Sequence, residues 1–286
     1  MRLADALAEA LATPVIDLRP ITGGDLNDAF AAELAGGERV FVKTAADAAP
    51  HAYRREAEGL AWLGEPGALP VPEVLAVADE PGAHRFLALS WVEAGRRTAS
   101  TDEQLGRGLA AVHAAGAPDH GGAHDLVLGP LTLPNDPCDD WASFYVTRRL
   151  EPLARMAARR GALPPEAPGL LDAVAARLPQ LAGPAEPPAR LHGDLWAGNV
   201  LTGADGRPWL VDPAAHGGHR EVDLAMLRLF GAPGPRFLAA YDESTPLADG
   251  YEERVELWQI LPLLVHAVLF GGRYGASAVA AMRRYT

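Results

Sequence analysis

Residues 190–201 read RLHGDLWAGNVL, a stretch that sets a histidine, an aspartate, a tryptophan and an asparagine between apolar flanks. His192, Asp194 and Asn199 follow the spacing H-x-D-x-x-x-x-N, and Asp212 ends the next apolar segment, RPWLVD. This is the layout of a phosphotransferase catalytic loop followed by a metal-binding aspartate. As the alternative, Asp194 and Asn199 would be two turn residues that stabilise a loop.

The chemistry of phosphoryl transfer explains this spacing. A hydroxyl nucleophile must be oriented and must lose its proton, so we expect Asp194 to be the catalytic base. Mg²⁺ is a hard cation that prefers oxygen ligands, so we expect the Asn199 amide and the Asp212 carboxylate to hold it against nucleotide phosphates. We expect His192 to brace the loop rather than act as a base.

A lysine and a glutamate upstream give independent support. Lys43 ends RVFVK, the second strand of a hairpin predicted at Gly36-Gly37, and Glu56 lies early on the next predicted helix. A kinase uses a strand lysine to hold the nucleotide's phosphates and a helix glutamate to hold that lysine, and we assign these roles to Lys43 and Glu56. Glu58 competes with Glu56 for this role, and each of these charges could instead be a solvated surface residue.

The loop at Gly23 and Gly24 is the candidate for further phosphate contacts. Its sequence, TGGDLNDAF, matches neither a P-loop nor a dinucleotide-binding fingerprint. By itself it could be a flexible turn. Because the other kinase-like residues are present, we expect the backbone N–H groups of this loop to lie over the nucleotide's phosphates.

The pattern of the chain changes near residue 92. Before it, alternating segments predict a strand-rich region with a first helix over Leu3, Leu7 and Leu11 and an internal helix over residues 51–65. After it, helical spacing dominates. We expect one helix to be capped by Thr101 and another to be interrupted or kinked at Pro152.

Composition excludes several classes of protein. The net charge of −12 and the pI of about 5.2 argue against a general nucleic-acid binder. The single cysteine, Cys138, rules out an intrachain disulfide and suits a reducing compartment. The N-terminal segment lacks the continuous apolar core of a signal peptide, and the apolar stretch at 257–270 is too short to span a bilayer. We therefore expect a cytoplasmic protein with no membrane partner.

Three segments, LHGDLWAGNVL, WASFYVTRRLEP and DPAAHGGHREVDLAML, resemble the fructosamine kinase, or ketosamine 3-kinase, family. This family belongs to the aminoglycoside phosphotransferase-like kinases, and the resemblance covers nearly the whole chain. It implies an α+β, protein-kinase-like, two-lobed fold: a small strand-rich nucleotide-binding lobe at 1–92 and a larger, mostly helical catalytic and substrate-binding lobe at 93–286. It also implies a deglycation reaction in which ATP phosphorylates the sugar 3-hydroxyl of fructosamine or ribulosamine, either as a small molecule or on a glycated lysine.

Trp196 carries most of the substrate information. The resemblance implies that it lines the sugar-amine pocket beside Asp194. An indole can cover the apolar face of a sugar or lie under a cationic amine, although Trp196 could also be a core residue that holds the loop. Two segments, AAHGGH and HGGAHDLVLGPLTLPN, lack the aromatic residues typical of the family, and we expect both to border the acceptor site.

Three other functions are open on sequence grounds. One is phosphorylation of an aminoglycoside or another small alcohol, against which Trp196 argues. Another is a nucleotide-binding pseudokinase, which the presence of the full set of polar residues disfavours. A serine/threonine protein kinase is disfavoured because no APE-like segment or extended activation loop follows Asp212.

Overall fold

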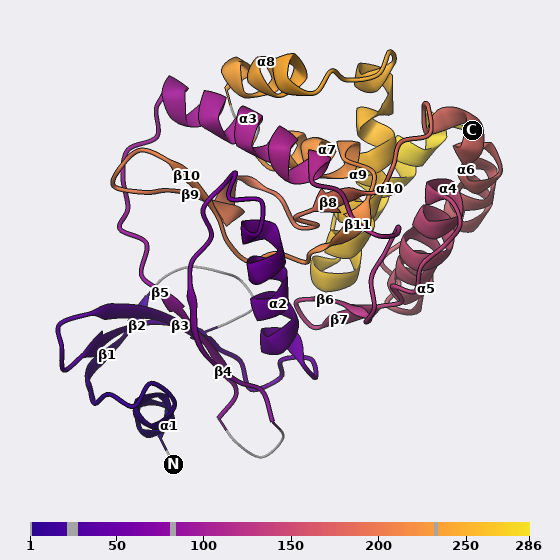
Figure 1. Cartoon of the computed structure of the whole chain (residues 1–286). Helices are drawn as coiled ribbons and strands as arrows, with labels where there is room; N and C mark the ends of the chain where they lie inside the picture. The colour runs from indigo at the N-terminus through magenta and orange to yellow at the C-terminus, as the bar shows by residue number, and fades with distance from the viewer. Residues whose placement is uncertain (1, 22–27, 81–83, 232–233) are drawn as a thin grey trace.

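The computed structural model describes residues 2–21, 28–80, 84–231 and 234–286 (Figure 1). A strand-rich N-terminal part lies beside a larger, mostly helical C-terminal part, with α2 (Ala52–Gly64) between them. This architecture confirms the predicted α+β fold class. The predicted division at residue 92 lies between the last strand of the N-terminal sheet, β5 (Phe86–Ser90), and α3 (Ala99–Ala114).

The N-terminal sheet has five strands in the order β1-β2-β3-β5-β4, and each strand is antiparallel to its neighbours. The β2–β3 hairpin turns at Gly36-Gly37 as predicted, and Gly37 has a φ of 87°, which glycine adopts without steric cost. The remaining bounds are α1 (Leu3–Ala10), β1 (Val15–Ile21), β2 (Asp28–Leu34), β3 (Arg39–Thr44) and β4 (Val74–Ala78).

Alternation along β3 explains where Lys43 lies. Val40 and Val42 pack with Leu7 of α1 in one apolar cluster, whereas Phe41 packs with the cluster on the α2 side of the sheet. Because successive side chains in a strand point to opposite faces, Lys43 shares the face of Phe41. The lysine therefore points toward α2, the helix that carries Glu56.

In its described residues, the C-terminal part is built from helices around one apolar core and three two-stranded antiparallel sheets. Its helices are α3, α4 (Trp141–Phe144), α5 (Glu151–Arg159), α6 (Ala167–Leu181), α7 (Glu221–Leu229), α8 (Pro235–Ser244), α9 (Tyr251–Phe270) and α10 (Tyr274–Arg283). Its strand pairs are β6 (Leu126–Leu128) with β7 (Leu131–Leu133), β8 (Ala189–Leu191) with β11 (His216–Gly218), and β9 (Val200–Thr202) with β10 (Pro208–Leu210). Among the described residues, no helix combines the length and apolar character needed to cross a membrane.

The predicted interruption at Pro152 is present as a π-helical segment, Tyr145–Leu150, between α4 and α5. Proline has no N–H, so Pro152 cannot donate to the carbonyl of Arg148 as an α-helix would require. That carbonyl accepts instead from Nη1 of Arg149, at 3.1 Å. The missing backbone donor is thus replaced by a side chain inside the helix.

Two details of the helical part differ from the sequence predictions. The cap of α3 is Thr98 and not Thr101: Thr98 Oγ1 accepts from the Thr101 backbone N–H, and Thr101 Oγ1 accepts from that of Thr98. This reciprocal pair starts the helix one turn earlier. In addition, β6 and β7 were not predicted, because three-residue strands carry too little alternation to stand out.

Candidate active site

Short strands hold the central loop in place. β8 leads into His192, and η2 (Ala197–Asn199), a single 3-10 turn, leads from Trp196 into β9. The segment that follows β10 runs back along this loop, since Val211 N–H donates to Asn199 O at 3.1 Å and Ala214 N–H donates to His192 O at 2.9 Å. These backbone bonds bring Asp212 beside Asp194.

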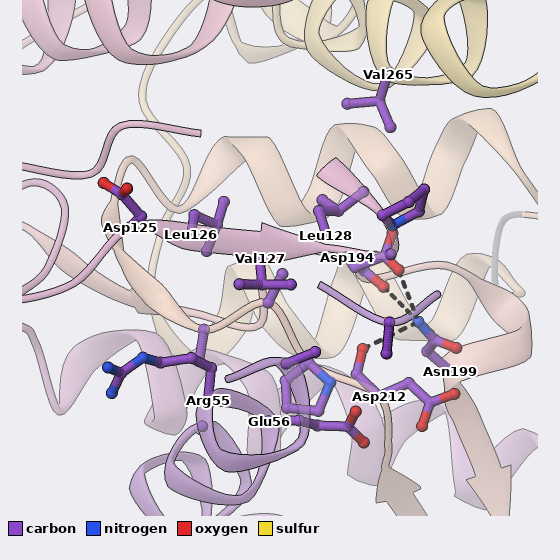
Figure 2. Close-up of a pocket in the computed structure, with 18 of the residues that line it drawn as sticks. Arg55, Glu56, Asp125, Leu126, Val127, Leu128, Asp194, Asn199, Asp212 and Val265 are labelled. Atoms are coloured by element: carbon purple, nitrogen blue, oxygen red, sulfur yellow. Dashed lines mark hydrogen bonds between the residues drawn. The ribbon is translucent and has the colours of Figure 1, made fainter. Parts of the chain in front are cut away.

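Asn199 joins the two aspartates. Its Nδ2 donates to Asp194 O at 2.8 Å, to Asp194 Oδ2 at 3.3 Å and to Asp212 O at 3.4 Å. None of these bonds uses the amide oxygen, Oδ1, so that atom can bind another partner. The three predicted residues therefore meet at one end of a cleft, as Figure 2 shows.

Lys43 binds two carboxylates across the cleft. Its Nζ pairs with Glu56 Oε2 and lies 3.0 Å from Asp212 Oδ1, although 169 positions separate Lys43 from Asp212. Glu56, and not Glu58, contacts the lysine; Glu58 pairs with Arg55 at 2.5 Å on the surface of α2. Gly23 and Gly24, the predicted phosphate loop, lie outside the described residues.

The electrostatics distinguish the three carboxyl groups around Lys43, which are those of Glu56, Asp194 and Asp212. Burial, with repulsion from Asp212, raises the pKa of Asp194 to about 7. Burial likewise raises the pKa of Glu56 to about 7, against the opposing attraction of Lys43. Burial also acts to raise the pKa of Asp212, but the Lys43 ammonium outweighs it, and the pKa of Asp212 lies below its ordinary value. Asp212 is therefore the anion of the site, whereas Asp194 can take up a proton near neutral pH.

The backbone at Asp212 is strained, and His192 supports it. Asp212 has a φ of 54°, in the left-handed region that non-glycine residues rarely occupy. His192 Nε2 donates to the carbonyl of the preceding Val211 at 2.9 Å, and its Nδ1 accepts from Asp194 N–H at 3.3 Å. Burial lowers the pKa of His192 and keeps it neutral. These contacts agree with a bracing role for His192.

Asp223 holds the backbone at the start of the loop that carries Asp194, a role that the sequence analysis missed. It is 1% exposed and accepts from the backbone N–H groups of His192, at 2.7 Å, and Gly193, at 2.9 Å. His113 Nε2 lies 3.2 Å from the same carboxylate. The sequence signal for this role of Asp223 is an acidic residue inside the apolar run VDLAML.

The cleft in front of these residues has a volume of about 1070 Å³. It runs from the three polar residues between α2 and β6, with Arg55 and Asp125 at the far end (Figure 2). Trp196 lines it and is 40% exposed, so this tryptophan is not a core residue. The side chain lies over Gly198, where an added methyl group would overlap the indole ring.

The two segments that depart from the family pattern occupy different places. Residues 122–130 and Asn135 line the cleft, as predicted for the HGGAHDLVLGPLTLPN segment. In the other segment only Ala214 and Ala215 reach this cleft, whereas His216 and His219 are buried. The expectation that the whole AAHGGH segment borders the acceptor site is wrong. The residues from His216 to Gly218 form β11, which pairs with β8 and is buried beside the loop that follows β8.

The residues at this end of the cleft fit a magnesium ion bound together with a nucleotide. They offer one carboxylate, 45% exposed in Asp212, and the Oδ1 of Asn199 that no described hydrogen bond uses. Within the described ranges, no group of three or more histidine, cysteine, aspartate and glutamate side chains could hold a metal by itself. Two protein oxygens suit Mg²⁺, which usually takes its remaining ligands from water and substrate phosphates.

Comparisons with known proteins agree on one family. The model of the fructosamine kinase family matches residues 2–286. The protein-ribulosamine 3-kinase, chloroplastic, of Oryza sativa subsp. indica is 31% identical over 284 residues, and the match covers 98% of this chain and 81% of the relative.

Solved structures extend the comparison to the fold. A crystal structure from Thermobifida fusca YX-ER1, provisionally named a fructosamine-3-kinase, has a TM-score of 0.91 and 42% identity, and the match covers 99% of this chain and 98% of that one. The aminoglycoside phosphotransferase APH(4)-Ia, solved with ADP and hygromycin B, has a TM-score of 0.65 at 17% identity, with 99% of each chain covered. This second likeness concerns the fold alone, and it confirms the kinase-like arrangement.

Proposed function

The chain belongs to the fructosamine kinase family, and we propose that it transfers the γ-phosphate of ATP to the 3-hydroxyl of a ketosamine. The observation that carries this proposal is the meeting of Lys43, Asp194 and Asp212 in one cleft that also exposes an indole. The acceptor is a ketose joined to an amine, such as fructosamine or ribulosamine. Removal of sugars from glycated amines would be the biological role.

In the proposed mechanism, the chain positions both substrates and moves one proton. Asp194 accepts a hydrogen bond from the sugar hydroxyl and takes its proton as the new oxygen–phosphorus bond forms. The bond from the γ-phosphorus to the bridging oxygen breaks, and ADP leaves. Lys43, held by Glu56, neutralises phosphate charge, whereas Gly23 and Gly24, predicted to contact the phosphates, lie outside the described residues.

Asn199 and Asp212 would hold Mg²⁺ through the amide oxygen and the carboxylate. When bound, the ion neutralises charge on the nucleotide phosphates. Trp196 provides a flat apolar surface for the sugar beside Asp194. We propose a cytoplasmic location, supported by the single cysteine, and no nucleic-acid partner, supported by the net charge of −12.

A substrate screen tests the reaction class. The purified chain is supplied with Mg²⁺-ATP and with fructosyl-lysine, ribulosyl-lysine, free sugars or aminoglycosides, and ADP release is measured. We expect turnover with at least one ketosamine and a phosphate on its O3, located by phosphorus NMR. Turnover on aminoglycosides or free sugars, without any on ketosamines, would overturn the assignment.

Gly198→Ala should displace the Trp196 indole and weaken use of the acceptor. The added methyl group overlaps the six-membered ring, while the backbone of residue 198 has no left-handed φ that alanine would resist. We expect KM for the ketosamine to rise about tenfold, consistent with loss of roughly one good aromatic contact. KM for ATP should stay within about twofold.

A double-mutant cycle and a matched control make this prediction specific. In a Trp196→Ala background, Gly198→Ala should have almost no further effect, because the ring it displaces is absent. Gly169→Ala, at a position in α6 where an added methyl group meets nothing within 4 Å, should leave both KM values unchanged. Additive losses in the cycle would mean that Gly198 acts independently of the tryptophan.

A further inference from the structure

The cleft contains a second surface that phosphoryl transfer does not require. It consists of Phe230, His266, Phe270 and Tyr274, and we call it the aromatic wall. Phe230 follows α7, His266 and Phe270 belong to the last turns of α9, and Tyr274 begins α10. All four line the same cleft as Asp194.

The rings of the wall form one continuous group. The centroid of His266 lies 4.4 Å from Phe230, 5.0 Å from Tyr274 and 5.4 Å from Phe270. Phe270 is 47% exposed. A large aromatic side chain left open to solvent inside a cleft is typical of a ligand-binding surface rather than of a core.

The wall adjoins the tryptophan expected to hold the sugar. A Cβ added at Gly231, the residue after Phe230, would lie 3.2 Å from the Cβ of Ala197, the residue after Trp196. The end of α7 and the loop of Trp196 are therefore in contact. A molecule that lies on Trp196 can extend onto the wall without leaving the cleft.

Charge in the cleft favours a cationic amine. Apart from Lys43 and the three carboxyl groups beside it, the lining has three acidic residues, Asp47, Glu58 and Asp125, and one basic residue, Arg55. Arg55 is already paired with Glu58. The nitrogen of a ketosamine is protonated at neutral pH, and aromatic faces attract such cations. A carboxylate attached close to that nitrogen would meet the acidic lining instead.

We propose that the aromatic wall binds the substituent on the ketosamine nitrogen, and that the preferred acceptors carry an apolar alkyl or aryl group there. This inference rests on the proposed function. It adds that the amine portion, and not only the sugar, determines which acceptors the chain selects, with Phe270 as the specificity-determining residue. A free alkylamine and the aliphatic side chain of lysine share this chemistry.

The test varies only the amine. The ketose that is used best in the screen is attached in turn to ammonia, n-butylamine, benzylamine and glycine, and kcat/KM is measured with saturating ATP. We expect the butyl and benzyl compounds to exceed the unsubstituted one by about tenfold, and the glycine compound to be the poorest. Phe270→Ala should remove most of the gain for butyl and benzyl while changing the unsubstituted compound less than twofold.

Controls separate the possible outcomes. Ile16→Ala, which truncates an apolar side chain that is 61% exposed on β1, should leave the series unchanged. Thermal unfolding checks each variant, and Phe270→Leu, which keeps apolar bulk, should retain part of the butyl gain. Equal kcat/KM for all amines, or an equal loss across the series in Phe270→Ala, would overturn the inference while leaving the ketosamine reaction intact.

If wild-type protein phosphorylates no ketosamine, the proposed function itself fails, and this inference fails with it. A further pair of acceptors distinguishes the sources of the alkyl group: the ketosyl-lysine as a free amino acid, and the same residue inside an uncharged peptide. If the peptide matches the butylamine compound, the wall accepts protein-borne lysine. If only small amines are used well, the wall serves free metabolites.

Discussion

Asp194→Asn should lower kcat by about 10²- to 10⁴-fold, the usual contribution of a general base, while KM for ATP changes little. The amide has the size of the carboxylate, and it can still accept from Asn199 Nδ2, which lies 3.3 Å from Asp194 Oδ2. It cannot take up the proton of the sugar hydroxyl. Steady-state kinetics with a ketosamine, together with nucleotide binding by calorimetry, provide the measurement.

The matched control for this variant is Asp172→Asn. Asp172 is exposed on α6, a helix that contributes no residue to the lining of the cleft. It makes the same chemical change and should leave kcat within about twofold, as expected of a surface substitution. If Asp194→Asn kept near-normal turnover, Asp194 could not be the base. If it lost nucleotide binding to the same extent, the residue would act mainly in holding the metal and phosphates.

The sequence was sufficient for those parts of the site that depend on local periodicity. Lys43 and Glu56 meet because a strand alternates its faces and a helix repeats every 3.6 residues, and both patterns are legible in RVFVK and HAYRREAEGL. The same holds for Asp194 and Asn199, which share one short loop. Their spacing in the sequence is enough to predict that the two side chains converge.

Other parts of the cleft depend on tertiary packing, which one sequence does not reveal. Phe230, Phe270 and Tyr274 come from three elements, and in the sequence they are scattered aromatic residues near apolar runs. The exposure of Trp196 was equally open, because the same motif would suit a buried tryptophan. His216 was expected at the acceptor site but is buried, because β11 forms three residue pairs with β8 that the pattern HGG does not predict.

Asp223→Ala should destabilise the fold by about 3–5 kcal/mol, the usual cost of removing one partner from a buried, charged hydrogen-bond group. The substitution leaves the N–H groups of His192 and Gly193 without their acceptor, and it removes the partner of His113. Buried donors that lose a partner pay their full desolvation cost. Urea unfolding should show a lower midpoint with an unchanged m value.

The same network makes the effect depend on pH. Burial acts to raise the pKa of Asp223, but the hydrogen bond and charge of His113, with His192, outweigh it, so the folded-state pKa lies below the ordinary value. A depressed carboxyl pKa adds stability above the unfolded-state value of about 3.9 and loses it as pH falls through the folded-state value. The difference in unfolding free energy between wild type and variant should therefore be constant from neutral pH down to about pH 4 and shrink below it.

Two comparisons decide whether Asp223 acts as this anchor. Asp172→Ala, on an exposed face of α6, should change the unfolding free energy by less than about 0.5 kcal/mol. Asp223→Asn keeps the shape of the side chain and one acceptor oxygen, but it turns an amide donor toward a backbone N–H. The unfolding free energy of this variant should therefore lie between those of the wild type and of Asp223→Ala. Because Asp223 holds the backbone directly before Asp194, both Asp223 variants should also lose kcat under conditions where they remain folded. Full activity in a folded Asp223→Ala protein would mean that the backbone bonds that His192 O and Asn199 O accept from the segment after β10 suffice to position the base.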